Sequence, residues 1–317
     1  MRRILTYQIT DEEENFTVQK FLAERVGLSR RQISGLKFRD RGICVNGDRC
    51  RVTTVLKAGD CLTFLAEEDG ESGQLVSGLE VPEILFEDEE LLVVNKPAGI
   101  LTHPVGGHYG DTLSNQVAAY YRSKGEPSVI RPVGRLDKDT SGAVLFAKTR
   151  LGAAQLTKKG EGKAVEKIYL AFVQGVPEKF SGEIYVPMGR CDGEKLKMEA
   201  DPVRGKTART FYRVVECMGE YSLVALGIDT GRTHQIRVHM TYLGHPLLGD
   251  SLYGEGEKMY GDKGEGFQRA ALHAFRLKIF KPFSDDTVEV TAPLPEDFQK
   301  HLSEDQIQRI LNRNFFS

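Results

Sequence analysis

Short apolar runs bounded by polar turn residues dominate the larger, C-terminal part of the chain. Runs of this kind are typical of strands that lie buried inside a sheet. One amphipathic helix interrupts them over residues 111–124, with Asp111 as its expected N-cap. No regular alternation of strand and helix is present, so the pattern predicts a mixed sheet of the α+β class. The expected strands cover residues 90–94, 143–147, 167–173, 210–215, 223–228 and 288–291.

The first part of the chain has a different pattern. A short amphipathic helix is expected to end near Gly27, and Ser29 is the expected N-cap of a second helix over residues 30–38. An Asn46-Gly47 pair predicts a hairpin whose second strand returns through Val52.

A polar stretch rich in Gly, Ser and acidic residues separates these two patterns and reads as a flexible linker. The sequence therefore predicts a small domain over residues 1–66, a linker over residues 67–80 and a larger domain over residues 81–317.

Charge is distributed unevenly along the chain. The formal net charge is only −2, but residues 20–57 carry ten Lys and Arg against three acidic residues, an excess of seven. A basic surface of this size is either a solvated face or a site for a polyanion.

Composition excludes several classes of protein. The 317 residues, 40% hydrophobic and 28% charged, are typical of a globular protein, and no apolar run suits a membrane span or signal peptide. Five cysteines without a CxxC pair indicate reduced thiols and a cytoplasmic protein, and seven histidines lack metal-ligand spacing. We therefore expect a monomer that binds neither a metal nor a cofactor, since nucleotide-binding fingerprints are absent as well.

The basic segment resembles the S4 RNA-binding domain, through "FLAERVGLSRRQISGLKFRDRGICVNG" and "VLKAGDCLTF". It departs from that family in "ENFTVQKFL", which lacks the aspartate usual two residues before the Phe-Leu pair. The resemblance implies a small α/β domain whose second helix faces structured RNA with Arg30, Arg31 and Lys37.

The larger domain contains the segment "RPVGRLDKDTSG" just before an expected buried strand. Packing alone does not require this mixture of acidic and basic residues. With "EKIYLAFV" and "TGRTHQIRVHMTYLGHPLLGD" this segment resembles the three signature motifs of the RluA-type (RluC/RluD-like) pseudouridine synthases. The segment "LLVVNKPAGILTHP" resembles the part that precedes them. The likeness runs from about residue 84 to about residue 290, and departs at Gly134, where many members have histidine.

The resemblance implies a largely antiparallel sheet and isomerisation of uridine in RNA without a cofactor. It implies that Asp137 acts on the ribose, either by attacking C1′ or by removing the C2′ proton. It further implies that Arg237 pairs with Asp137, that Tyr169 stacks on the flipped base, and that Arg135 fills the gap left in the RNA. Arg232 and His234 are expected to contact RNA.

Each of these residues also has a structural interpretation. Asp137 suits a turn, Tyr169 suits a core position on an apolar strand, and Arg237 suits a structural ion pair. The other histidines are expected to form hydrogen bonds or to lie near RNA.

Two other functions compete with RNA isomerisation. One is a non-catalytic RNA-binding factor of ribosome assembly. The three expected catalytic residues are all present, which argues against this alternative. The other is a phosphotransferase, because "DKDTS" resembles an Asp-x-Asp-x-Thr loop, but Ser141 stands where threonine is needed and no continuous apolar strand precedes it. Large-subunit ribosomal RNA is the expected substrate, with transfer RNA as the alternative. The sequence assigns no function to a loop at residues 255–266 or to a short terminal helix at 305–311.

Overall fold

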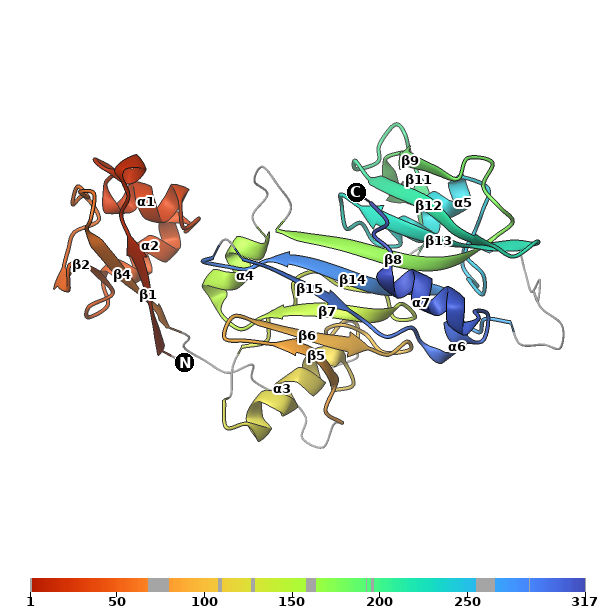
Figure 1. The fold of residues 1–317 in the computed structure, drawn as a ribbon, viewed down its shortest axis with the longest axis horizontal. Coiled ribbons are helices and arrows are strands. Elements are labelled where there is room, and N and C mark those ends of the chain that lie inside the picture. The colour runs from red at the N-terminus through yellow and green to blue at the C-terminus, as the bar shows by residue number, and fades with distance from the viewer. Residues whose placement is uncertain are drawn as a thin grey trace.

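A computed structural model describes residues 2–67, 80–107, 110–126, 129–157, 164–191, 193–194, 197–254, 266–284 and 286–316. The expected linker and the 255–266 loop lie outside these residues, apart from their end residues. Figure 1 shows a small N-terminal module at one end of the molecule and a long, twisted sheet beside it. Within the described parts of the chain, no helix is long and apolar enough to cross a membrane.

The N-terminal module, residues 2–67, is a four-stranded antiparallel sheet in the order β1-β4-β2-β3, packed against two helices. Its own core includes Leu22, Leu56, Leu62 and Phe64, each at most 1% exposed. Its elements are β1 (Arg2–Gln8), η1 (Asp11–Glu13), α1 (Val18–Glu24), α2 (Arg30–Lys37), β2 (Ile43–Val45), β3 (Asp48–Arg49) and β4 (Cys61–Glu67).

The predicted helices of this module are confirmed, and Ser29 caps α2 by accepting a hydrogen bond from the Gln32 N–H at 3.3 Å. Two details were wrong. Strand β1 was not expected, although it pairs with β4 along its whole length. The hairpin's return strand, β3, ends at Arg49 and does not reach Val52.

The body, residues 80–316, is built on a nine-stranded sheet in the order β5-β6-β7-β14-β8-β13-β12-β9, with β15 paired to β14. All pairs are antiparallel except β7 with β14, so the expected mixed, largely antiparallel α+β fold is confirmed. The strands are β5 (Glu83–Glu87), β6 (Leu91–Lys96), β7 (Ser141–Ala147), β8 (Val165–Gln174), β9 (Ser181–Tyr185), β12 (Arg209–Cys217), β13 (Tyr221–Ile228), β14 (Leu272–Phe280) and β15 (Thr287–Thr291). A separate hairpin joins β10 (Met188–Arg190) to β11 (Met198–Ala200).

The central strands β6, β7, β8, β13 and β14 are buried on both faces, which explains their apolar runs. Along β8, Tyr169 and Ala171 face one core, which α3 (Leu113–Ser123) and α5 (Gln235–Tyr242) complete. Leu170 and Phe172 face the other core, covered by α6 (Glu296–Gln299) and α7 (Glu304–Asn312). Helix α4 (Arg150–Thr157) packs at the end nearest the N-terminal module (Figure 1). The alternation places Tyr169 on the α5 face.

Two predicted helices in the body can be compared with the structure. The terminal helix is confirmed as α7. The predicted N-cap Asp111 was wrong, because α3 begins one residue later, with Thr112 as its cap. Thr112 and Asn115 form a buried capping box in which the Asn115 side chain accepts the Thr112 N–H at 3.2 Å.

Gly142 permits the single parallel contact of the sheet. Its φ is +111°, and a Cβ there would lie 2.2 Å from the Ala274 carbonyl oxygen, so only glycine fits. The close approach of β7 and β14 fixes where the preceding loop, residues 134–141, lies relative to β8.

Candidate active site

The loop of residues 134–141, here called the Asp137 loop, lines a cavity of about 130 Å³ together with β8, the 231–234 turn and α5. Six of the nine residues predicted to form the site border this cavity, although they are spread over a hundred positions of sequence: Arg135, Asp137, Tyr169, Arg232, His234 and Arg237. The other three, Arg30, Arg31 and Lys37, lie exposed on α2 of the N-terminal module.

The backbone of the Asp137 loop is bonded from outside. The buried Thr102 hydroxyl donates to the Leu136 carbonyl at 3.0 Å and accepts the Leu136 N–H at 3.1 Å. The fully buried Lys96 ammonium donates to the Lys138 carbonyl at 2.9 Å, and the Gly99 N–H donates to the same oxygen at 2.9 Å. These bonds leave the half-buried Asp137 side chain directed at the cavity.

Strand β8 contributes two side chains to the cavity, because positions two apart on a strand share a face. Tyr169 is 5% exposed, and burial, with a smaller effect of the Asp137 charge, raises the pKa of its phenol. Lys167 was not predicted as a site residue, although its spacing from Tyr169 could have revealed it. Burial lowers the pKa of Lys167. Its Nζ lies 2.7 Å from where a Cβ of Gly134 would stand, so the ammonium occupies space that a side chain at position 134 would need.

The expected direct pairing of Arg237 with Asp137 was wrong. Arg237 lies in the first turn of α5, but its Nε and Nη2 donate to the two carboxylate oxygens of Asp250, at 2.7 and 2.6 Å. Asp250 is the better partner because its side chain is fully buried and needs a cation. Asp137 still acts on the same guanidinium, since it is among the charges that raise the pKa of Arg237.

Asp250 and Tyr253 were missed by the sequence interpretation, although "LLGD" was part of the third motif. Asp250 Oδ1 also accepts the N–H groups of Leu252 and Tyr253, at 3.0 and 3.2 Å. The Arg237 guanidinium carbon lies 4.9 Å from the centre of the Tyr253 ring, and the Tyr253 hydroxyl bonds His234 Nδ1 at 2.9 Å. These contacts hold the arginine between a carboxylate and an aromatic face.

His234 sits at the start of α5 in the left-handed region, with φ 56°. This conformation costs energy for a residue with a side chain, and neighbouring bonds maintain it. Buried Gln235 accepts the Thr230 hydroxyl at 2.7 Å and the Arg232 N–H at 3.1 Å, which closes the turn. Burial lowers the pKa of His234, against the opposing charge of Asp137, so its imidazole is neutral at pH 7.

Known proteins are similar to this chain in sequence and in fold. Residues 90–242 match the model of the RNA pseudouridylate synthase family. The RNA pseudouridine synthase YhcT of Bacillus subtilis is 39% identical over 81% of this chain and 83% of its own length. The chain belongs to the RNA pseudouridine synthase family. Ribosomal large subunit pseudouridine synthase D of Pseudomonas aeruginosa is 36% identical over 85% of both chains.

A solved relative agrees with this family assignment. Human RNA pseudouridylate synthase domain containing 1 superposes with a TM-score of 0.56 at 28% identity, over 75% of this chain and 98% of its own. The protein is therefore an enzyme, an RNA pseudouridine synthase, which is an isomerase.

Asp250→Asn tests whether the second carboxylate holds Arg237. We expect a loss of about 3 kcal/mol in the free energy of unfolding, because a buried arginine loses its counter-charge. We also expect kcat to fall about 100-fold as the guanidinium shifts from its place beside Asp137. Denaturant melts and steady-state pseudouridine formation measure both. Glu183→Gln, which breaks the exposed ion pair with Arg209, is the control and should change stability by less than about 1 kcal/mol. Unchanged turnover in Asp250→Asn would contradict the role.

Lys96→Met tests the bonds under the Asp137 loop. Lys96 also donates to the Pro97 and Ile100 carbonyls, at 2.9 and 2.8 Å, and its loss should cost about 3 kcal/mol of stability. Exposed Lys138→Met, whose side chain contributes no such bond, is the control.

The difference in stability between wild type and Lys96→Met should also depend on pH. Burial lowers the pKa of Lys96 from 10.5 to about 7 in the folded protein, so between these values the unfolded chain binds more protons. The stability of wild type relative to Lys96→Met should rise by up to about 1.4 kcal/mol per pH unit from pH 7 towards 10, and be lost as pH falls towards 7. Parallel stability curves for the two proteins would refute the assignment.

Proposed function

We propose that this enzyme, acting as a monomer, converts uridine to pseudouridine in large-subunit ribosomal RNA. The observation that carries the proposal is the convergence of Asp137, Tyr169 and Arg237 on one cavity from three separate segments. The choice of RNA is supported by relatives named ribosomal large subunit pseudouridine synthase D, one of which, from Zymomonas mobilis, is 42% identical over 68% of this chain.

Asp137 acts on the ribose of the flipped uridine. In the overall reaction the bond from C1′ to N1 breaks, a bond from C1′ to C5 forms, the proton at C5 is released to solvent and N1 takes up a proton from solvent. The carboxylate either attacks C1′ or removes the C2′ proton, and both roles need it ionised. Arg237, held by Asp250, lines the same cavity as Asp137.

Tyr169 packs against the flipped base. Its raised pKa keeps the phenol protonated at neutral pH, so stacking suits it better than removal of the C5 proton as a phenolate. Removal of that proton is left to another group or to water.

Residues at the rim of the cavity hold the RNA. Arg135 is exposed and long enough to occupy the space that the flipped base leaves in the stack. Arg232 and His234 also line the cavity, the first as a cation and the second as a neutral hydrogen-bonding group.

The N-terminal module is an S4-like RNA-binding domain, joined to the synthase domain through residues 67–80. Arg30, Arg31 and Lys37 are exposed on α2, while Ile33 and Leu36 of the same helix are buried in the module's core. A helix with one anchored face and one cationic face can lie against RNA phosphates.

The reaction is tested by tritium release from RNA labelled at uridine C5, comparing ribosomal and transfer RNA that lack modification. Asp137→Asn should abolish release while RNA binding stays within about threefold, because loss of the nucleophile or base removes the chemical step. Asp305→Asn, on the exposed side of α7, is the control and should behave as wild type. Tritium release from transfer RNA alone would show that the substrate is transfer RNA. Tritium release by Asp137→Asn would contradict the catalytic role of Asp137.

The module is tested with Arg30→Ala, Arg31→Ala and Lys37→Ala combined in the full chain. The slope of log affinity against log salt concentration is negative. The loss of three phosphate contacts should reduce its magnitude by about 2 to 3. Arg25→Ala is the control within the module, since Glu12 and Glu13 already neutralise that charge at 2.9 Å. An unchanged salt slope in the triple variant would show that α2 does not contact the RNA.

A further inference from the structure

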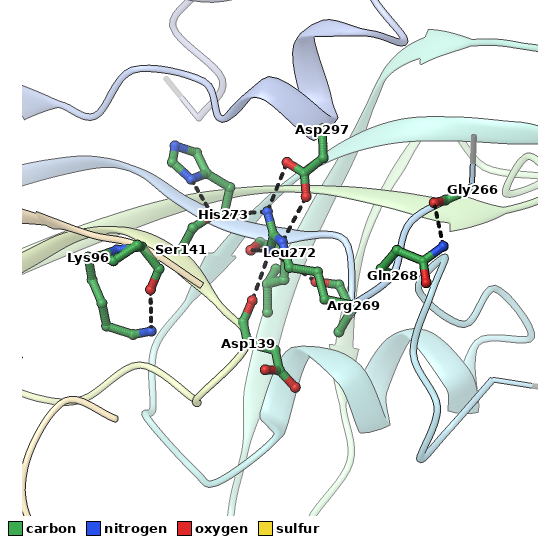
Figure 2. Close-up of polar contacts among 11 residues, drawn as sticks. Lys96, Asp139, Ser141, Gly266, Gln268, Arg269, Leu272, His273 and Asp297 are labelled. Atoms are coloured by element: carbon green, nitrogen blue, oxygen red, sulfur yellow. Dashed lines mark hydrogen bonds and ion pairs between the residues drawn. The ribbon is translucent and has the colours of Figure 1, made fainter. Parts of the chain in front are cut away.

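Arg269 bonds the far side of the Asp137 loop, opposite Lys96 and Thr102. Its Nη1 donates to the Asp139 carbonyl at 2.9 Å, and its Nη2 donates to the Ser141 hydroxyl at 3.2 Å. Figure 2 shows the guanidinium between these loop groups and Asp297. The side chain is only 12% exposed.

Asp297, on α6, sets the direction of that guanidinium. It accepts from Arg269 Nε at 2.8 Å and from Nη2 at 3.1 Å, which is a bidentate pair with a fixed plane. With this edge held by Asp297, Nη1 points away from α6, towards the loop and the Ala270 and Leu272 carbonyls at 3.2 and 3.0 Å.

Helix α6 is itself held firmly. Phe298, the residue after Asp297, is fully buried and packs on Phe172 of β8 with ring centres 5.0 Å apart. The Arg269 guanidinium carbon lies 5.7 Å from the centre of the Phe298 ring. The position of Asp297 is therefore fixed by the core of the sheet.

We propose that Arg269 and Asp297 are positioning residues for catalysis, through which the C-terminal segment fixes the Asp137 loop. The proposal rests on the function proposed for Asp137. Neither residue touches the cavity that holds Asp137, and both lie beyond residues 90–242, which match the family. They act on the backbone that carries the carboxylate, two residues after it.

A matched control stands seven residues further along the chain. Arg276, on β14, is 8% exposed and donates to the Leu311 and Arg313 carbonyls at 2.7 and 3.1 Å. It anchors the C-terminal segment as Arg269 does, but none of its described bonds reaches the Asp137 loop. Arg276→Gln therefore reports the effect of loosening the C-terminus alone.

The experiment compares full-length Asp297→Ala, Arg269→Lys and Arg276→Gln by hydrogen exchange of the amides at 137–141 and by single-turnover tritium release. Asp297→Ala should speed exchange in the loop about tenfold and slow the chemical step about tenfold or more, with RNA affinity within about threefold. Arg269→Lys keeps the charge but not the planar fork, so it should do the same. Asp297→Glu, which can re-form the pair, should recover most of the rate.

The outcomes separate this proposal from the one it rests on. Unchanged loop exchange in both Asp297→Ala and Arg269→Lys overturns it, and so does an equal loss of rate in Arg276→Gln. Faster loop exchange with no tritium release by wild type from any RNA would support the bracing of the loop and refute the proposed reaction. Faster exchange with an unchanged rate would show that the brace does not serve catalysis.

Discussion

The position of the Asp137 loop depends on hydrogen bonds from side chains elsewhere in the chain to the backbone carbonyls of the loop. A loop at the edge of a cavity would ordinarily bond its carbonyls to water, but here Thr102, Lys96 and Arg269 occupy the acceptors at Leu136, Lys138 and Asp139. These donors come from segments on both sides of the loop in sequence. Once the backbone is bonded in this way, the Asp137 side chain is the group left to meet a substrate.

The electrostatics of the cavity follow from two carboxylates near one arginine. Asp250 is fully buried and takes the two shortest bonds of Arg237, so the pair is nearly neutral when seen from the cavity. Asp137, half-buried, contributes to raising the pKa of both Tyr169 and Arg237 without displacing Asp250. The cavity therefore places a carboxyl group beside a phenol and a neutral histidine, next to the Arg237–Asp250 pair.

Apolar runs in the sequence predicted the fold class and six of the nine strands of the large sheet, because such runs report burial directly. The residues that meet at the cavity were implied by the resemblance of three motifs to a known family. It could not predict contacts whose partners are far apart. Arg237 looked like the partner of Asp137 because both stand in motifs, whereas the choice of Asp250 depends on burial, which only the folded chain defines. Strand β1 was missed for the same reason, since its pairing with β4 spans the whole N-terminal module.

Gly134 shows how a departure from a family pattern acquires a physical meaning. Where many relatives have histidine, this chain has a glycine with φ +87°, and the Lys167 ammonium lies where its side chain would begin. The lysine lines the cavity from β8, on the same face as Tyr169. Burial lowers the pKa of this lysine. Because Gly134 has no side chain, the Lys167 side chain from β8 occupies this point of the cavity wall.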